Sequence, residues 1–200
     1  MINKTCFAFA VLLATTGAAQ AQASSTNTVM IPAPMRVMLG FNAVGGGDDL
    51  VSAKRTDGKT DTIKAGEGIA FYAGVDYRVA PAFSLQASLG YHTNRISADN
   101  GKLEFTRIPA ELLAFYHINE NWRVGGGLRY VSKPTLKGSG VASMRDVEFD
   151  NTTSGVVEAE YLMGQHWGFQ ARYVHERLKL DGYRGDINAD QAGLGVRYYF

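Results

Sequence analysis

The chain has 200 residues, which suits one domain of moderate size, and its formal net charge is +1. Its 20 basic and 19 acidic residues show no clustered basic excess, which argues against nucleic acid as a partner. The single cysteine, Cys6, excludes a disulfide framework, and no segment reaches the roughly 18 consecutive apolar residues of a transmembrane helix.

Residues 1–23 have the features of a secretory signal peptide. One cation precedes an apolar run over Cys6–Leu13, and possible A-x-A cleavage sites end at Ala21 and Ala23. A lipoprotein cysteine would follow the apolar run instead of preceding it, so no lipid anchor is expected. The mature domain is expected to span residues 24–200.

Eight segments alternate between apolar and polar or small residues with the period of a β-strand. In the segment 69–79, for example, Phe71 and Val75 lie on one face, and Asp76 and Arg78 lie on the other. An even number of such strands, several of about 10 residues, is typical of a barrel that crosses a bilayer. The eight segments are 37–43, 69–79, 83–92, 108–117, 122–130, 157–163, 167–174 and 192–200.

The connections between these segments alternate in length. Short turns are expected near residues 80–82, 119–121 and 164–166. Longer polar loops are expected over about 45–66, 94–102, 133–153 and 180–189. Short turns on one rim and long loops on the other predict an all-β, eight-stranded antiparallel up-and-down transmembrane barrel, with both termini in the periplasm.

The charged residues of the strands lie on the same face as most of the strand glycines. If the apolar face meets lipid, these charges converge in a narrow lumen where opposite charges can pair, and the glycines make room for large side chains. A charge on the lipid face near the midplane would cost roughly 2–4 kcal/mol. Glu176 is expected to join the interior set, with His92 and His117 beside it. The predicted lumen network comprises Asp76, Arg78, Arg107, Glu111, Arg123, Arg129, Glu158, Glu160, Arg172 and Arg197.

Aromatic residues of the apolar face lie near the strand ends, where outer-membrane barrels carry aromatic girdles. Ordinary strand propensity would also enrich aromatics, but Trp122 and Trp167 each open a strand directly after a short turn. The predicted girdle comprises Tyr77, Phe83, Tyr91, Trp122, Tyr130 and Trp167.

The stretch "KLEFTRIPAELLAFYHINENWRVGGGLRYV" and the terminal alternation resemble small eight-stranded outer-membrane proteins of the OmpA-domain and OmpX type. The resemblance covers the whole mature chain and implies the outer membrane of a Gram-negative bacterium. It also implies that the last strand is read by the barrel-insertion machinery. The residues matching that insertion signal are Leu194, Val196, Tyr198 and Phe200.

No catalytic or cofactor motif is complete. The Gly58-Lys59-Thr60 triplet has Ala53 where a P-loop requires glycine, and no histidine has a serine two residues later. We therefore predict a non-enzymatic barrel without cofactor or metal, monomeric, with outer-membrane lipid and lipopolysaccharide as partners. It would serve envelope structure or loop-mediated interaction. Two alternatives stay open: a narrow porin-like channel, because inward glycines leave some volume, and a lipopolysaccharide-modifying enzyme.

Overall fold

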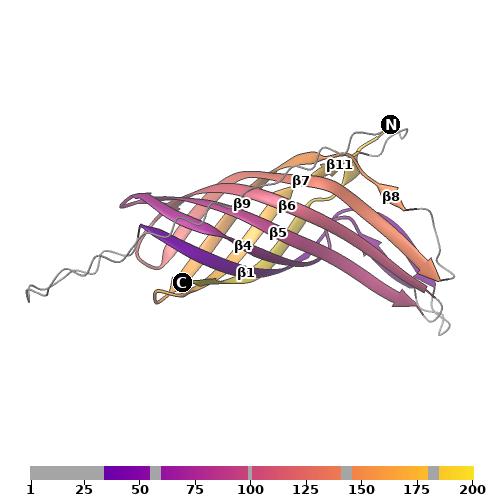
Figure 1. The fold of residues 1–200 in the computed structure, drawn as a ribbon, viewed down its shortest axis with the longest axis horizontal. Coiled ribbons are helices and arrows are strands. Elements are labelled where there is room, and N and C mark those ends of the chain that lie inside the picture. Colours follow the sequence, from indigo (N-terminus) through magenta and orange to yellow (C-terminus); the bar gives the residue numbers. More distant parts are fainter. Residues whose placement is uncertain (1–33, 55–59, 99–100, 141–145, 180–184) are drawn as a thin grey trace, which may run out of the picture. The chain divides into compact units, whose positions relative to one another are not determined.

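A computed structural model describes residues 34–54, 60–98, 101–140, 146–179 and 185–200, and in this part of the chain the structure consists of β-strands and their connections (Figure 1). The predicted signal peptide, residues 1–23, lies outside the described residues. No helix in the described part is long and apolar enough to cross a membrane.

Eight long strands form one closed antiparallel sheet, which confirms the predicted barrel. Around the barrel the order is β6-β5-β4-β1-β13-β10-β9-β7, and β7 pairs again with β6. The long strands are β1 (Met35–Gly45), β4 (Gly68–Ala80), β5 (Phe83–Ala98), β6 (Gly101–His117), β7 (Trp122–Gly140), β9 (Thr152–Met163), β10 (Trp167–His175) and β13 (Gln191–Tyr199). Five short strands lie in the connections: β2 (Asp49–Lys54), β3 (Thr60–Lys64), β8 (Val147–Glu148), β11 (Arg177–Leu178) and β12 (Ile187–Asn188).

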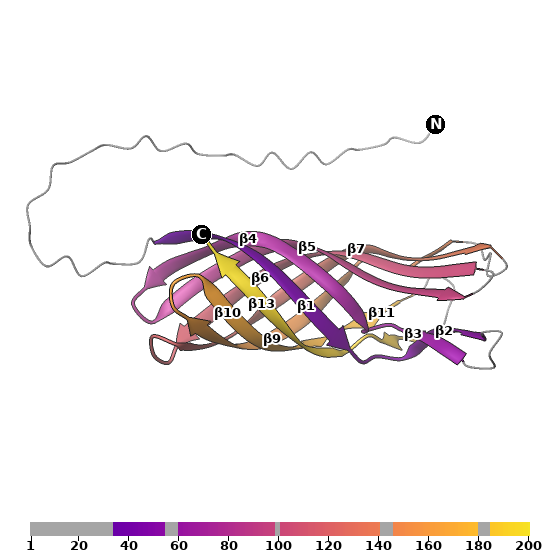
Figure 2. The ribbon, with the colours of Figure 1, turned by 90° about the horizontal axis from the view of Figure 1, so that it is seen from below.

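Pairing between β1 and β13 closes the barrel, and the two strands run side by side in Figure 2. Their register runs from Met38 opposite Tyr199 to Gly45 opposite Ala192. The backbone N–H of Phe200 also donates to the carbonyl of Val37 at 2.9 Å. Closure leaves none of the eight wall strands with an unpaired edge, which a strand in lipid could not tolerate.

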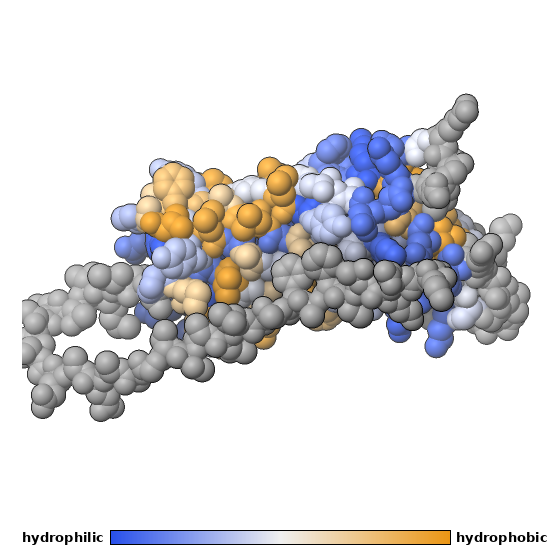
Figure 3. Space-filling view, turned by 45° about the horizontal axis from the view of Figure 1, so that its top comes forward, coloured by the Kyte–Doolittle hydropathy of each residue, from blue (hydrophilic) through white to orange (hydrophobic). Residues whose placement is uncertain are grey.

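The wall alternates between an apolar outer face and an inner face that carries the buried charges together with some buried apolar side chains. Along β10 every second residue is exposed, and those exposed residues include Trp167, Phe169 and Tyr173. The residues between them, such as Gln170 and Arg172, are buried. Figure 3 shows the apolar surface gathered over the half of the barrel that holds the short turns, whereas hydrophilic residues cover the loop end. An apolar outside and a charged inside match a wall that faces lipid.

The six predicted girdle residues all point outward, each with between 44% and 50% of its surface exposed. Tyr77, Phe83, Trp122 and Trp167 lie near the short-turn end of the barrel, and Tyr91 and Tyr130 lie toward the loop end. Several contact further outward aromatics: Phe83 packs against Tyr116, and Trp122 against Tyr161.

The prediction of long polar loops is wrong for much of the loop end. Strands β5, β6 and β7 continue well beyond the predicted segments, and the other connections form the hairpins β2–β3 and β11–β12. Together these elements enclose a second, apolar interior that we call the apolar plug. Its buried members are Ile63, Ala65, Leu103, Phe105, Leu136, Phe149, Leu178 and Ala189.

A β-bulge in β7 sets the faces of the plug. Thr106 pairs with Thr135 and Ile108 with Ser132, so β7 uses one residue more than β6 between the same two pairs. The extra residue lies at Lys133, whose φ of 40° is unusual for a residue other than glycine. Beyond the bulge the alternation changes phase, which turns Leu136 into the interior and Lys137 outward.

At some of the inward glycines, neighbouring side chains already fill the space that a Cβ would occupy. A Cβ on Gly90 would lie 2.6 Å from the ring of Tyr72, and one on Gly125 would lie 2.5 Å from the ring of Phe115. The volume on which the channel alternative depended is therefore occupied at these positions.

This packing predicts that one glycine substitution lowers the free energy of unfolding and that another leaves it nearly unchanged. Gly125→Ala should lower the free energy of unfolding by about 1–3 kcal/mol, because the new methyl group must displace the Phe115 ring or the backbone of β6. Gly155→Ala is the matched control, since its Cβ would have no neighbour within 4 Å. Urea unfolding of the refolded barrel, followed by tryptophan fluorescence, measures both. Equal stabilities would contradict the packing described here.

Candidate functional site in the barrel interior

Basic and acidic side chains alternate along the interior in one connected series, which we call the charge ladder. Each member lies within 4.0 Å of the next, with nitrogen facing oxygen at every step. Seven of the eight wall strands contribute, and β5 adds polar side chains instead. In order from the short-turn end, the members are Arg36, Asp76, Arg123, Glu160, Arg197, Glu158, Arg172, Glu111, Arg129, Glu176 and Arg107.

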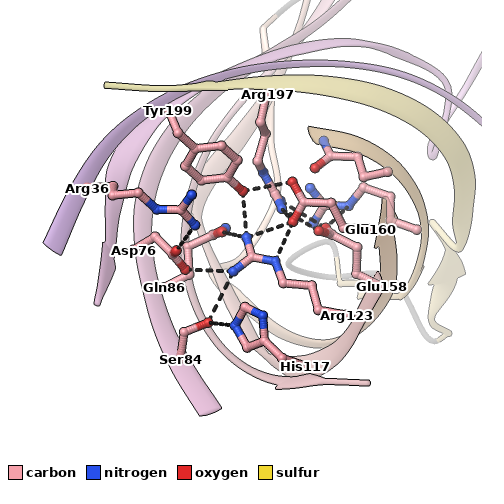
Figure 4. Close-up of polar contacts among 12 residues, drawn as sticks. Arg36, Asp76, Ser84, Gln86, His117, Arg123, Glu158, Glu160, Arg197 and Tyr199 are labelled. Atoms are coloured by element: carbon pink, nitrogen blue, oxygen red, sulfur yellow. Dashed lines mark hydrogen bonds and ion pairs between the residues drawn. The ribbon is translucent and has the colours of Figure 1, made fainter. Parts of the chain in front are cut away.

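Arg123 of β7 is the centre of the lower half of the ladder (Figure 4). Its Nη1 donates to Asp76 at 2.8 Å, its Nε to Glu160 at 2.7 Å, and its Nη2 to the hydroxyl of Tyr199 at 2.5 Å. The guanidinium also lies 4.1 Å from the ring centre of Phe115. One buried side chain thus joins β7 to β4, β9, β13 and β6 across the lumen.

The rest of the lower half is equally well paired. Arg36 donates to Asp76 at 2.7 Å, and Arg197 donates to both oxygens of Glu158 and to Glu160. The Tyr199 hydroxyl donates to Glu160 at 2.7 Å. Three arginines and three carboxylates therefore neutralise one another in this half, through charge-assisted hydrogen bonds.

The upper half is less tightly bonded. Arg172 donates to Glu111 and Arg107 donates to Glu176, each at 2.7 Å. Between these two pairs lies Arg129, whose nearest carboxylate oxygens are 3.6 Å away on Glu176 and 3.8 Å away on Glu111. Those distances permit attraction but exceed ordinary hydrogen bonds.

The structure brings nine of the ten predicted network residues into this interior, and it places Glu176, His92 and His117 there as well. The exception is Arg78, which is half-buried at the short-turn rim and donates to the carbonyl of Pro81 at 2.7 Å. Because Arg78 is two residues from the end of β4, its long side chain reaches the turn instead of the lumen.

The predicted lumen network did not include Arg36, Gln86 and Tyr199, which the structure also places in the interior. All three continue the inward phase of their strands: Arg36 precedes Met38, and Tyr199 follows Arg197. Extending the alternation by one inward position at each strand end would have found Arg36.

Comparison with known proteins identifies the family. The family model for the outer membrane protein beta-barrel domain matches residues 8–200. The chain belongs to this family. No curated protein matches the chain.

The solved structures of Ail show the same fold as this family member. Ail, the attachment invasion locus protein of Yersinia pestis, in complex with the heparin analogue sucrose octasulfate, has a TM-score of 0.54 and 16% identity, covering 83% of this chain and 97% of Ail. Ail without that ligand has a TM-score of 0.53, with the same identity and coverage. Neisserial surface protein A has a TM-score of 0.47 and 14% identity, over 84% of this chain and 97% of its own.

The outer wall of the family member carries one further polar cluster, at the loop end of β10. Asp190 accepts hydrogen bonds from the Tyr173 hydroxyl at 2.8 Å, from His175 Nδ1 at 3.2 Å and from the backbone N–H of Glu176 at 3.0 Å. Partial burial raises the pKa of the Asp190 carboxyl, but these hydrogen bonds outweigh it and hold the pKa below its ordinary value. Among the described residues, no group of three or more His, Cys, Asp or Glu side chains could hold a metal ion.

The buried ladder predicts a large stability difference between two arginine substitutions. Arg123→Met should lower the free energy of unfolding by about 3–5 kcal/mol, because it leaves Asp76 and Glu160 short of a buried partner. Arg95→Met, which removes the exposed ion pair with Glu104 at 2.9 Å, should cost less than about 1 kcal/mol. Urea titrations of both refolded variants provide the comparison. If Arg123→Met were as stable as Arg95→Met, the ladder would have no structural role.

Proposed function

We propose that this chain is a non-enzymatic, non-conducting barrel of the outer membrane, which reinforces the envelope and presents a rigid surface at its loop end. The observation that carries this proposal is the apolar plug. A channel needs a continuous polar or hydrated path, whereas the loop end of this lumen is filled by buried apolar side chains.

The plug meets the charge ladder directly. The guanidinium of Arg107, the last member of the ladder, lies 5.1 Å from the ring centre of Phe105. Phe105 in turn packs edge-on against Phe149, with 5.8 Å between the two ring centres. Leu103 and Leu136 belong to the same cluster. An ion that entered between the charges would have to shed its water before passing this layer, which opposes conduction.

This proposal places the loop end at the cell surface. The first residue of β1 and the last residue of β13 then lie on the periplasmic side. β1 begins and β13 ends at the short-turn end, and outer-membrane barrels keep their short turns in the periplasm. The plug then stiffens the exposed connections, because residues of β3, β6, β7 and β11 share one core. A rigid surface of this kind lowers the entropic cost of binding a partner.

Lipopolysaccharide is the partner that the surface chemistry supports best. Two adjoining surface hollows of about 470 and 400 Å³ lie on the outer side of β5, β6 and β7. They are lined by the outward cations Arg95, Lys102, Lys133 and Lys137, by the buried Arg107, and by only two acids of the described residues, Glu104 and Asp146.

The first hollow also contains the outward residues Tyr91 and Ile108, so cations lie directly beside the apolar band. This order, apolar surface followed by cations, suits a lipid whose acyl chains are attached to a phosphorylated head group. The related fold of Ail binds the polyanion sucrose octasulfate, which shows that such a barrel can carry an anion site. The argument for this chain depends on its own cations.

Single-channel recording tests the closed lumen. We expect the refolded mature chain to give no discrete conductance steps in a planar bilayer, because both the plug and the paired charges obstruct the path. Glu111→Gln is the informative variant, since it changes a buried charge in the upper lumen. Reproducible steps whose size differs between the wild type and Glu111→Gln would instead establish a channel.

Charge reversal tests the lipopolysaccharide surface. The double variant Lys102→Glu/Lys133→Glu should bind lipopolysaccharide at least about tenfold more weakly in co-sedimentation at low salt, since each cation near an anionic lipid surface is worth about 1 kcal/mol. The control Lys64→Glu/Lys179→Glu makes the same change at exposed lysines outside both hollows and should bind within about twofold of wild type. Equal losses in both variants would refute a specific site.

A further inference from the structure

The charge ladder ends on arginine at both ends, so it contains one more cation than anions. Arg36, Arg123 and Arg197 balance Asp76, Glu158 and Glu160 in the lower half. In the upper half, three arginines face two carboxylates. The upper members are Arg107, Arg129 and Arg172 with Glu111 and Glu176. The upper lumen therefore holds a surplus of one positive charge.

The surplus coincides with an arginine that lacks hydrogen bonds. The side chain of Arg129 is fully buried, yet none of its three nitrogens has a hydrogen-bond acceptor among the residues that the structure describes. A buried guanidinium without acceptors is strongly disfavoured unless an acceptor or a counter-charge is supplied.

Neighbouring groups are also short of acceptors. Arg107 Nε, Arg172 Nε and Gln191 Nε2 are buried donors without a partner in the described part of the chain. On the acceptor side, Glu111 Oε2 and Gln170 Oε1 are without a partner. Unpaired donors thus outnumber unpaired acceptors in the same half of the barrel that carries the surplus positive charge.

The residues level with Arg129 are small on two nearby strands. Arg129 pairs in register with Ser154 of β9 and with Glu111 of β6, which pairs in turn with Ser88 of β5. The Ser88 hydroxyl has no hydrogen-bond partner among the described residues and can rotate to donate. Serine side chains are smaller than the glutamine and glutamate side chains that lie inward at lower levels, such as Gln86 and Glu160.

From the charge surplus and the unpaired donors together, we infer that the upper lumen binds one small monovalent inorganic anion, chloride, against the guanidinium of Arg129. A monovalent anion neutralises the surplus, whereas a divalent phosphate or sulfate would reverse its sign. The plug above and the paired lower ladder below exclude larger organic anions. Water could occupy the donors, but it would leave the positive charge unbalanced.

Bromide provides the direct test, because it replaces chloride and scatters X-rays anomalously. Crystals of the refolded wild-type barrel grown in bromide should show an anomalous peak in direct contact with the Arg129 guanidinium nitrogens. Density for water alone at this position, or bromide only at surface lysines, would overturn the inference. This measurement needs no variant and so does not depend on one folding.

Anion exchange at constant ionic strength tests the same site in solution. In chloride at ten times its dissociation constant, the midpoint of thermal unfolding should be about 3–6 °C higher than in gluconate, which is too large to enter. Arg129→Gln should abolish this difference because it removes the surplus charge. Arg95→Gln, which changes an exposed arginine, should retain it. A difference that survives in Arg129→Gln would assign the effect to general salt and refute the site.

Discussion

The interior of an eight-stranded barrel is too narrow to hydrate a set of charged side chains, so every charge placed there needs an opposite charge within reach. Here that requirement is met by strict alternation, in which each carboxylate of the ladder lies between two arginines. The ladder joins strands that are not neighbours in the sheet, as when Arg123 of β7 reaches Asp76 of β4. It therefore acts across the barrel, where backbone pairing cannot.

Such a ladder also specifies register. A shift by one residue of any strand that contributes to the ladder would turn its buried charges toward lipid and its apolar residues into the lumen. Burial of ion pairs is not automatically stabilising, so their value here is better understood as specificity of pairing. The inward glycines serve the same end, because Gly40 and Gly168 leave the space that Arg197 and Glu160 occupy.

Much of this arrangement follows from the sequence alone, because period-two alternation identifies both the strands and the face that carries charge. This alternation predicted the eight wall strands and most of the charged residues of the interior. The pattern does not predict the contacts across the lumen. It does not show which arginine pairs with which carboxylate, or that Arg78 donates to the carbonyl of Pro81 at the rim. Arg36 was missed because the predicted segment began at residue 37, one position after it, although the alternation continues to the strand end.

The larger error concerned the loop end, and its cause is physical. Leu103 and Phe105 occupy the same inward phase of β6 as Arg107 and Glu111, although their polarity is opposite. Alternation reveals two faces but does not say which one meets solvent, since that depends on whether lipid or water surrounds the wall.

Below the level of Arg107 the outside is apolar and the inside carries the charge ladder, as a wall in lipid allows. Above it the inside is apolar and the outside carries cations such as Lys102 and Lys137, as in a water-soluble barrel. The change of polarity along the continuous strand β6 therefore marks where the barrel leaves the membrane. The bulge at Lys133 keeps the adjacent strand β7 in step with that change, because it turns Leu136 inward at the level where the interior becomes apolar.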